Sequence, residues 1–175
     1  GLTYMNSILK NKLSRVKLLA LDFDGVLTDG YVYVTQDGRE SVRCSRKDGL
    51  GIELLKKAGL NVVVLSKETN LVVKTRCRKL KIECWQGISA GFDKTEILKE
   101  ILKAKNLYPE EVCYVGDDIN DIDVIKYVGI GIAVADSHIL VKKAADYVTK
   151  AAGGHHAVRE VVELIFESKD MEIKI

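Results

Sequence analysis

The chain has 175 residues, of which 47% are hydrophobic and 30% are charged, and its 27 basic and 25 acidic side chains leave a net charge of +2. This length suits one domain with a sizeable core, and the balanced charge gives no basic field of the kind that nucleic-acid-binding proteins use. No apolar run approaches the roughly 20 residues that a membrane-spanning helix needs. We therefore expect neither a nucleic-acid partner nor a membrane partner.

Residues 1–15 lack a signal-peptide pattern and are expected to be a leader, with a short amphipathic or basic helix over residues 6–15. A single domain is expected over residues 16–175. Its four cysteines are widely spaced and show no metal-binding pattern. Scattered thiols are typical of a reducing compartment, so we expect a cytoplasmic protein without a disulfide framework or a zinc site.

The mostly apolar residues 16–21 predict a strand that is buried on both faces. Asp22 and Asp24 follow it at once, and Gly25 begins a turn. Two charges at the end of a buried strand are costly unless they bind a metal or share in chemistry, so this stretch predicts a functional site. The alternative is a solvated strand end with capping aspartates.

Residues 31–35 and 40–45 flank a turn over residues 36–39 that contains Asp-Gly, and they predict a β-hairpin that stands over the end of the first strand as a flap. Asp48 is expected to cap the next helix, and Gly59 to end it. Helices are expected over residues 49–58, 69–80, 94–106, 138–145 and 156–167, with one more after residue 121, and strands over residues 61–66, 82–85, 112–116, 130–134 and 147–148. This alternation predicts one α/β domain with a Rossmann-like, doubly wound parallel sheet.

Polar side chains stand where several of these elements begin or end. Ser66 ends the second strand, Lys94 begins a helix, and Asp117, Asp118 and Asp121 follow a later strand. Ligands of such sheets collect at the carboxyl ends of the strands. Taken singly, Ser66 reads as a strand-end cap, Lys94 as a solvated helix residue, and the acids as a capped turn.

Carboxylates that meet at one edge repel each other unless a hard cation lies among them, and oxygen ligands without histidine indicate Mg²⁺. A lysine and a hydroxyl beside that metal suit a phosphoryl group. One aspartate can take the phosphoryl group covalently. A second can protonate the leaving alkoxide and later activate water.

The ordered set Asp22-Phe23-Asp24-Gly25-Val26, Ser66, Lys94 and Gly116-Asp117-Asp118-Ile119-Asn120-Asp121 resembles the haloacid dehalogenase superfamily of phosphohydrolases, over about residues 16–166. The resemblance implies that Asp22 is the nucleophile and Asp24 the general acid and base. Ser66 and Lys94 would hold the phosphoryl oxygens, and Lys94 would also orient Asp22. Mg²⁺ would lie on the Asp22 carboxylate, the Asp24 main-chain oxygen and Asp117, with support from Asp118 and Asp121.

A narrower resemblance is carried by Asp29-Gly30, Lys47-Asp48-Gly49, Gln86-Gly87, Val134-Ala135-Asp136, Gly153-Gly154 and Ala157-Val158-Arg159-Glu160. This set is similar to the capless sugar-acid phosphatases, which act on 3-deoxy-manno-octulosonate 8-phosphate or 3-deoxy-nonulosonate 9-phosphate and include the carboxyl-terminal domain of some acylneuraminate cytidylyltransferases. The resemblance implies no cap domain, and a homotetramer in which a neighbour's hairpin covers the site. Asp48 and Arg159 are candidate substrate-specificity residues.

Two departures from the family pattern affect the substrate. Ser66-Lys67 stands where the family commonly has Thr-Gly, and serine retains the hydroxyl. Glu68-Thr69 stands where the octulosonate enzymes have Arg-Lys, and Glu68 with Arg76 and Lys79 on the same predicted helix matches the nonulosonate pattern. Arg76 or Lys79 would bind the substrate carboxylate, and Glu68 would accept a sugar hydroxyl. The alternative is an ordinary charged helix surface.

We therefore expect a Mg²⁺-dependent phosphatase that acts through a phospho-aspartyl intermediate on a 2-keto-3-deoxy sugar acid phosphate, in lipopolysaccharide, capsule or sialic-acid-type synthesis. Another small phosphorylated metabolite is an alternative substrate. A non-catalytic module of a cytidylyltransferase system is disfavoured because Asp22, Asp24, Lys94 and Asp117 are all present. A receiver domain is disfavoured because Asp24 supplies an acid that such a domain does not need.

Overall fold

Six parallel strands form the central sheet of the computed structural model, which describes residues 5–88 and 93–174. The strand order β5-β4-β1-β6-β7-β8 confirms the predicted doubly wound sheet. Leu21, the last residue of β1, is in register with Val64 of β4 and Val115 of β6, so these strands end at one edge. The strands are β1 (Leu18–Leu21), β4 (Asn61–Leu65), β5 (Glu83–Trp85), β6 (Val112–Gly116), β7 (Ile130–Ala133) and β8 (Tyr147–Val148).

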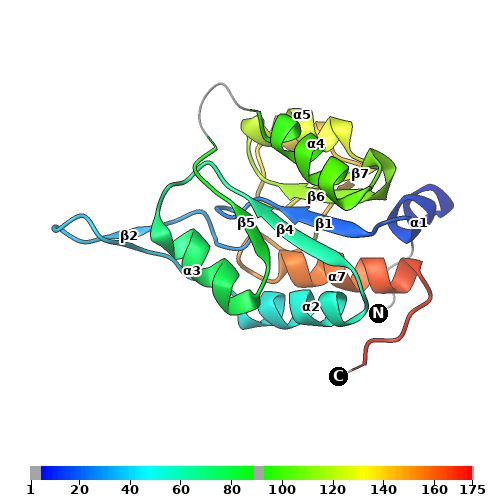
Figure 1. Cartoon of the computed structure of the whole chain (residues 1–175), viewed down its shortest axis with the longest axis horizontal. Helices are drawn as coiled ribbons and strands as arrows, with labels where there is room; N and C mark the ends of the chain where they lie inside the picture. Colours follow the sequence, from blue (N-terminus) through cyan, green and yellow to red (C-terminus); the bar gives the residue numbers. More distant parts are fainter. Residues whose placement is uncertain (1–4, 89–92, 175) are drawn as a thin grey trace.

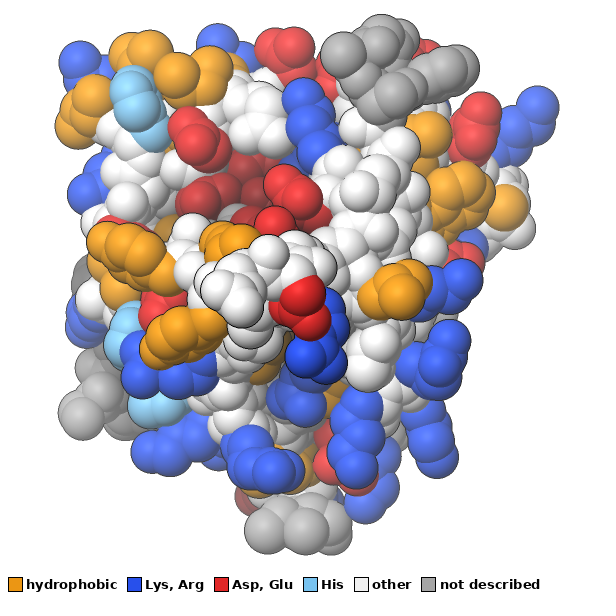
Figure 2. All heavy atoms as spheres, turned by 90° about the vertical axis from the view of Figure 1, so that its left-hand side faces the viewer, with side chains coloured by type: hydrophobic (Ala, Val, Ile, Leu, Met, Phe, Trp, Pro, Cys, Tyr) orange, Lys and Arg blue, Asp and Glu red, His pale blue; other side chains and the backbone are white. Residues whose placement is uncertain are grey.

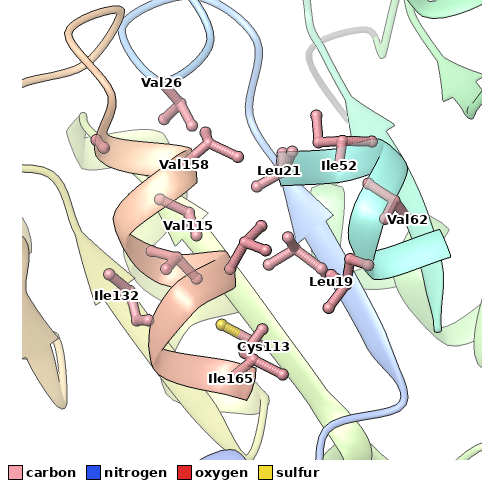
Figure 3. Close-up of a cluster of buried hydrophobic side chains, with 14 of the residues drawn as sticks. Leu19, Leu21, Val26, Ile52, Val62, Cys113, Val115, Ile132, Val158 and Ile165 are labelled. Carbon is pink, nitrogen blue, oxygen red and sulfur yellow. The ribbon is translucent and has the colours of Figure 1, made fainter. Parts of the chain in front are cut away.

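Helices cover both faces of the sheet (Figure 1). Successive residues of β1 point to opposite faces, so Leu19 and Leu21 join one hydrophobic cluster while Leu18 and Ala20 join the other. Figure 3 shows the first cluster between β1, β6 and their covering helices. The first face carries α2 (Arg46–Lys57), α3 (Leu71–Leu80) and α7 (Ala157–Ser168), and the second carries α4 (Lys94–Lys105), α5 (Ile122–Tyr127) and α6 (Ile139–Ala144).

The chain between β1 and α2 forms a hairpin, as predicted, but its paired strands are shorter than expected. They are β2 (Tyr33–Val34) and β3 (Glu40–Ser41), and the hairpin extends beyond the edge of the sheet (Figure 1). Tyr33 and Val34 are exposed, because no second layer packs on this two-stranded ribbon, which limits its length. No cap domain is present in the described part of the chain between β1 and α2.

Residues of the predicted leader form α1 (Ser7–Ser14), which packs against α7 and buries Leu13 in the first cluster. Residues 1–4 lie outside the described residues. None of the described helices has the length and apolar character needed to cross a membrane.

Two local predictions are wrong. Asp48 does not cap α2, because Ser45 does so: its hydroxyl accepts from the backbone N–H groups of Lys47 and Asp48, which starts the helix at Arg46. Glu68 does not share a helix with Arg76 and Lys79, because α3 begins only at Leu71, after the N-cap Asn70. Glu68 therefore lies in the loop between β4 and α3.

Candidate active site

Acidic side chains gather in a hollow on the face that the carboxyl ends of the strands reach (Figure 2). Asp22 follows β1 directly, and its backbone N–H donates to the carbonyl of Val115 at 3.0 Å, which continues the sheet by one residue. Its Oδ1 accepts from the N–H of Phe23 at 2.7 Å. Asp22 is only 7% exposed, so the sheet itself fixes this carboxylate at the carboxyl end of β1.

Lys94, the first residue of α4, is buried between two carboxylates. Its Nζ lies 3.1 Å from Oδ1 of Asp22 and 2.9 Å from Oδ1 of Asp121. Burial by itself lowers the pKa of Lys94, but the two carboxylates outweigh it and raise that pKa. Lys94 is therefore a fixed cation that joins α4 to the ends of β1 and β6.

Asp121 has both of its oxygens satisfied by the protein. Tyr114 donates its hydroxyl to Oδ1 at 2.5 Å, beside Lys94, while the backbone N–H groups of Asp117 and Asp118 donate to Oδ2 at 3.0 and 3.3 Å. Asp121 ends the short 3₁₀ helix η2 (Ile119–Asp121) and is fully buried. These contacts hold the loop after β6 in place.

Asp117 lies in contact with the turn after β1. A Cβ on Gly25 would come within 1.8 Å of Oδ2 of Asp117, so only glycine, here at a φ of +80°, leaves room for the carboxylate. Carboxylate oxygens of Asp22, Asp117 and Asp121 all lie within 4.8 Å of one another. The exposed Asp118 caps η2 by accepting from the N–H of Ile119 at 2.8 Å.

Two of these carboxyl groups, those of Asp22 and Asp117, have raised pKa values. Burial raises the pKa of Asp22 to about 6, against the opposing effect of Lys94. Burial and the charge of Asp22 raise the pKa of Asp117 to about 9. A hard divalent cation between the two groups would remove this repulsion, and an all-oxygen donor set is what Mg²⁺ prefers. The residues present thus fit a magnesium ion.

Asp24 is half-buried, two residues beyond Asp22. Burial raises its pKa, and the negative charges of Glu68 and Glu40 raise it further. A raised pKa favours the protonated carboxyl group, which is the form that a general acid needs.

The loop after β4 carries Ser66, which is 1% exposed. Its Oγ accepts from the N–H of Glu68 at 3.1 Å. The carbonyl of Glu68 in turn accepts from Nε2 of Gln86 and from the N–H of Gly87, both at 3.0 Å. Ser66 is therefore at the predicted strand end, and Glu68 is held by the segment after β5.

The predicted glycine pair supports the turn after β1. Gly154 donates its N–H to the carbonyl of Val26 at 3.0 Å, and a Cβ on Gly153 would lie 1.7 Å from the carbonyl oxygen of Gly25. Two backbones can approach this closely only where a side chain is missing. The pair packs against the turn after β1 in the same chain.

Arg76 and Lys79 make no ion pair with Asp22, Asp24 or Asp117 in the described structure. They line a groove of about 900 Å³ between the hairpin and α3, which Asp22, Asp24 and Asp117 do not line. Arg76 lies against α2, since a Cβ on Gly49 would come within 2.9 Å of its Nη2.

Arg159 and Asp48 are also engaged elsewhere. Arg159 donates from Nε to Glu163 at 3.0 Å and from Nη1 to the carbonyl of Lys47 at 3.2 Å. The Asp48 carboxylate is buried and accepts from the backbone N–H of Arg159 at 2.9 Å, so it caps α7 from the side of α2.

Sequence reasoning missed two hydroxyl groups. Tyr114 is fully buried beside Lys94 and Asp121. The sequence indicated this role only by placing a tyrosine in an otherwise apolar strand, because a buried tyrosine hydroxyl needs a hydrogen-bond partner. Thr28 accepts at Oγ1 from the N–H groups of Gly25 and Gly30, both at 3.1 Å, and so closes the turn. The position of Thr28, four residues after Asp24, did not indicate this role from the sequence.

Comparison with known proteins agrees with this geometry. Residues 64–162 match the family described as haloacid dehalogenase-like hydrolase. The chain is 39% identical over 155 residues to 3-deoxy-D-manno-octulosonate 8-phosphate phosphatase from Escherichia coli K12, a match that covers 88% of this chain and 81% of that protein.

Solved structures give the same result. The 3-deoxy-D-manno-octulosonate 8-phosphate phosphatase from Yersinia pestis superposes with a TM-score of 0.91 at 35% identity, covering 95% of this chain and 89% of that one. The phosphatase of the same name from Moraxella catarrhalis, in complex with magnesium, phosphate and a KDO molecule, gives a TM-score of 0.90 at 32% identity, covering 95% and 94%.

Proposed function

Because the chain belongs to the haloacid dehalogenase-like hydrolases, in their capless sugar-acid phosphatase branch, we propose that it hydrolyses the phosphate monoester of a 2-keto-3-deoxy sugar acid with Mg²⁺ as cofactor. The observation that carries the proposal is the buried contact of Lys94 with Asp22, 3.1 Å apart at the end of β1. A carboxylate paired with a cation in this position is oriented toward an incoming phosphoryl group.

In the proposed reaction, Asp22 is the nucleophile. Its carboxylate oxygen forms a bond to phosphorus, the bond from phosphorus to the sugar oxygen breaks, and Asp24 gives its proton to the leaving alkoxide. Asp24 then takes a proton from a water molecule that attacks the phospho-aspartyl group, which releases phosphate and restores Asp22. Ser66 and Lys94 hold the phosphoryl oxygens, and Lys94 also keeps Asp22 oriented.

The residues that would hold Mg²⁺ are Asp22 and Asp117 through their carboxylates and Asp24 through its main-chain oxygen, with Asp118 and Asp121 in support. When bound, the ion supplies positive charge against the phosphoryl oxygens. The contact between Gly25 and Asp117 supports this assignment, because it fixes Asp117 toward Asp22.

The length of the substrate is the finer part of the proposal. The relatives are named for the eight-carbon octulosonate 8-phosphate. Glu68 is exposed in the loop after β4, and its negative charge raises the pKa of Asp24. There it would accept a hydroxyl of the sugar, which favours the nine-carbon nonulosonate 9-phosphate. Further proposed specificity residues, more distant from the acids of the same chain, are Arg76, Lys79, Asp48 and Arg159.

We also propose a homotetramer in which a neighbour's hairpin covers the site. Tyr31, Tyr33 and Val34 are exposed by 77%, 67% and 64%, an apolar display for which a second copy is a suitable partner. Sedimentation of the wild type is expected to give four chains per particle, and Tyr33→Glu is expected to lower that number. A monomeric wild type would contradict this proposal.

A cytoplasmic location completes the proposal. The four cysteines Cys44, Cys77, Cys84 and Cys113 are free, as expected for a reducing compartment.

The test of function is phosphate release from octulosonate 8-phosphate and from nonulosonate 9-phosphates, with Mg²⁺ and with a chelator. The wild type is expected to need Mg²⁺, and Asp22→Asn to release no phosphate while remaining folded. Glu68→Arg is expected to shift the preference toward the octulosonate ester, whereas Glu68→Gln serves as the size-matched control. Full turnover by Asp22→Asn would overturn the mechanism, and a strong wild-type preference for the eight-carbon ester would overturn the role of Glu68.

A further inference from the structure

One side-chain contact joins the hairpin to the loop after β4. Asn70 donates from Nδ2 to Oε2 of Glu40 on β3 at 2.7 Å, across 30 residues of sequence. Within the described residues, this is the only side-chain hydrogen bond that leaves the segment 33–41 for another part of the chain. The base of the hairpin is held separately, by the bridge between Thr28 and Cys44 and by Arg43 on Asp29 at 3.3 Å.

Asn70 is itself fixed from two further sides. Its Oδ1 caps α3 by accepting from the N–H of Val72 at 3.0 Å, and its carbonyl accepts from Nε2 of Gln86 at 2.9 Å. The same Nε2 donates to the carbonyl of Glu68 at 3.0 Å. Asn70 therefore joins three segments, namely β3, α3 and the chain after β5. It lies two residues after Glu68 in the sequence.

A free hairpin of this size is marginal in water, because each strand contributes two paired residues, of which Tyr33, Val34 and Ser41 are exposed and only Glu40 is half-buried. A partly buried hydrogen bond to a carboxylate contributes more than a neutral one. The contact between Asn70 and Glu40 thus decides where the hairpin stands relative to Ser66 and Glu68, which lie at the other end of the loop.

We propose that Asn70 is a positioning residue for substrate selection, because its bond to Glu40 latches the hairpin to the loop that carries Ser66 and Glu68. The inference rests on the proposed function in one respect, namely that the latched space receives the sugar part of a phosphate monoester. Hydrolysis of a small aryl phosphate such as p-nitrophenyl phosphate needs the acids and Lys94, but it does not need the hairpin to be held against the loop.

The experiment reverses the polarity of the bond. Asn70→Asp keeps the Oδ1 that caps α3 but puts a carboxylate against Glu40, which breaks the latch. The double variant Asn70→Asp with Glu40→Gln restores one donor and one acceptor at the same net charge. Asn61→Asp, the same chemical change at the exposed start of β4, is the matched control.

The rate of backbone amide hydrogen exchange in residues 31–44 reports whether the hairpin is held in place, and it needs no substrate. Exchange is expected to be faster in Asn70→Asp, and close to wild type in the double variant and in Asn61→Asp. For the sugar acid ester, Asn70→Asp is expected to raise KM about tenfold, the size of one charge-assisted hydrogen bond, while p-nitrophenyl phosphate turnover stays within about twofold.

Unchanged hairpin exchange in Asn70→Asp would overturn the latch, and so would a double variant that fails to recover. An equal loss on both substrates would show that Asn70 acts on the chemistry and would overturn the selection role. If the wild type hydrolyses neither sugar acid ester, the proposed function fails, but the exchange measurement still decides whether the latch exists.

Discussion

The acids at the end of β1 and the cations beside the hairpin are held in very different ways. Lys94 and Asp121 are fully buried, and each has its polar atoms satisfied by fixed partners. Arg76 and Lys79 line an open groove instead, and Glu68 lies exposed in a loop. The first region is completed by the core of one domain, whereas the second depends on a hairpin that is attached to the domain at few points.

In the proposed mechanism, the first region carries out the reaction and the second recognises the rest of the substrate. Groups that carry out chemistry must be preorganised to within fractions of an ångström, and packing against a parallel sheet provides that order. Groups that recognise the rest of a substrate can lie on more mobile elements, because they contribute binding energy over a larger surface. We therefore expect substitutions at the first region to change stability and turnover together, and those at the second to change selectivity.

Lys94→Met is expected to have the largest effect. It removes the cation between Asp22 and Asp121 and leaves two buried carboxylates without a positive charge beside them, a loss of about 3–5 kcal/mol in the free energy of unfolding. Phosphatase activity should be lost as well. Urea unfolding is the measurement, with Lys99→Met, an exposed lysine of the same helix, as the control. Equal and small effects of the two substitutions would mean that the acids are not charged partners of Lys94.

Gly25→Ala tests the contact between the first turn and Asp117. The new Cβ would lie 1.8 Å from Oδ2 of Asp117 and would therefore displace that carboxylate. Mg²⁺ binding, measured by calorimetry, is expected to disappear. Gly38→Ala is the control, because Gly38 has a similar φ of +86° but no atom within 4 Å of a Cβ. Both variants carry a backbone cost of about 1–2 kcal/mol. Retained metal binding in Gly25→Ala would show that Asp117 is not the ligand.

The contrast also explains what could be predicted from the sequence. Asp22, Ser66, Lys94 and Asp117 stand at the ends of regular elements, and a parallel sheet brings those ends together whatever the loops do. Arg76 was expected to share a helix with Glu68, but Asn70 caps α3 after Glu68 and separates them. Asp48 was expected to cap its own helix, but it caps α7, 111 residues away. Such partners across the fold leave no local pattern.

Tyr114→Phe sharpens the comparison within the first region. The variant removes one hydroxyl, leaves Lys94 on Oδ1 of Asp121, and should lower the free energy of unfolding by about 1–3 kcal/mol. Turnover should fall with it, because Asp121 orients both Lys94 and the loop of Asp117. Tyr127→Phe is the control, since its ring contacts Lys99 on the surface and no hydrogen bond of its hydroxyl is found in the described chain. Equal effects of the two variants would contradict the role of Tyr114.

The smallest effect is expected at Asp48, between the two regions. Asp48→Ala uncaps α7 and should cost about 0.5–2 kcal/mol. Asp48→Asn keeps the oxygen that accepts from the N–H of Arg159. It also removes the charge of a buried carboxylate, whose Oδ2 has no partner in the described structure. This variant should therefore be at least as stable as the wild type near neutral pH.

The contribution of Asp48 to stability depends on pH, and burial sets the sign of this dependence. Burial raises the pKa of Asp48 in the folded state above its value in the unfolded chain. The wild-type carboxyl therefore stabilises the fold most when protonated, below the unfolded pKa of about 3.9, and loses this contribution as pH rises through the folded value. The advantage of Asp48→Asn over the wild type should accordingly grow from acid toward neutral pH in parallel urea unfolding curves. An advantage that shrank with rising pH would mean that the charged form of Asp48 is favoured in the fold, through a partner on Oδ2 that binds the carboxylate.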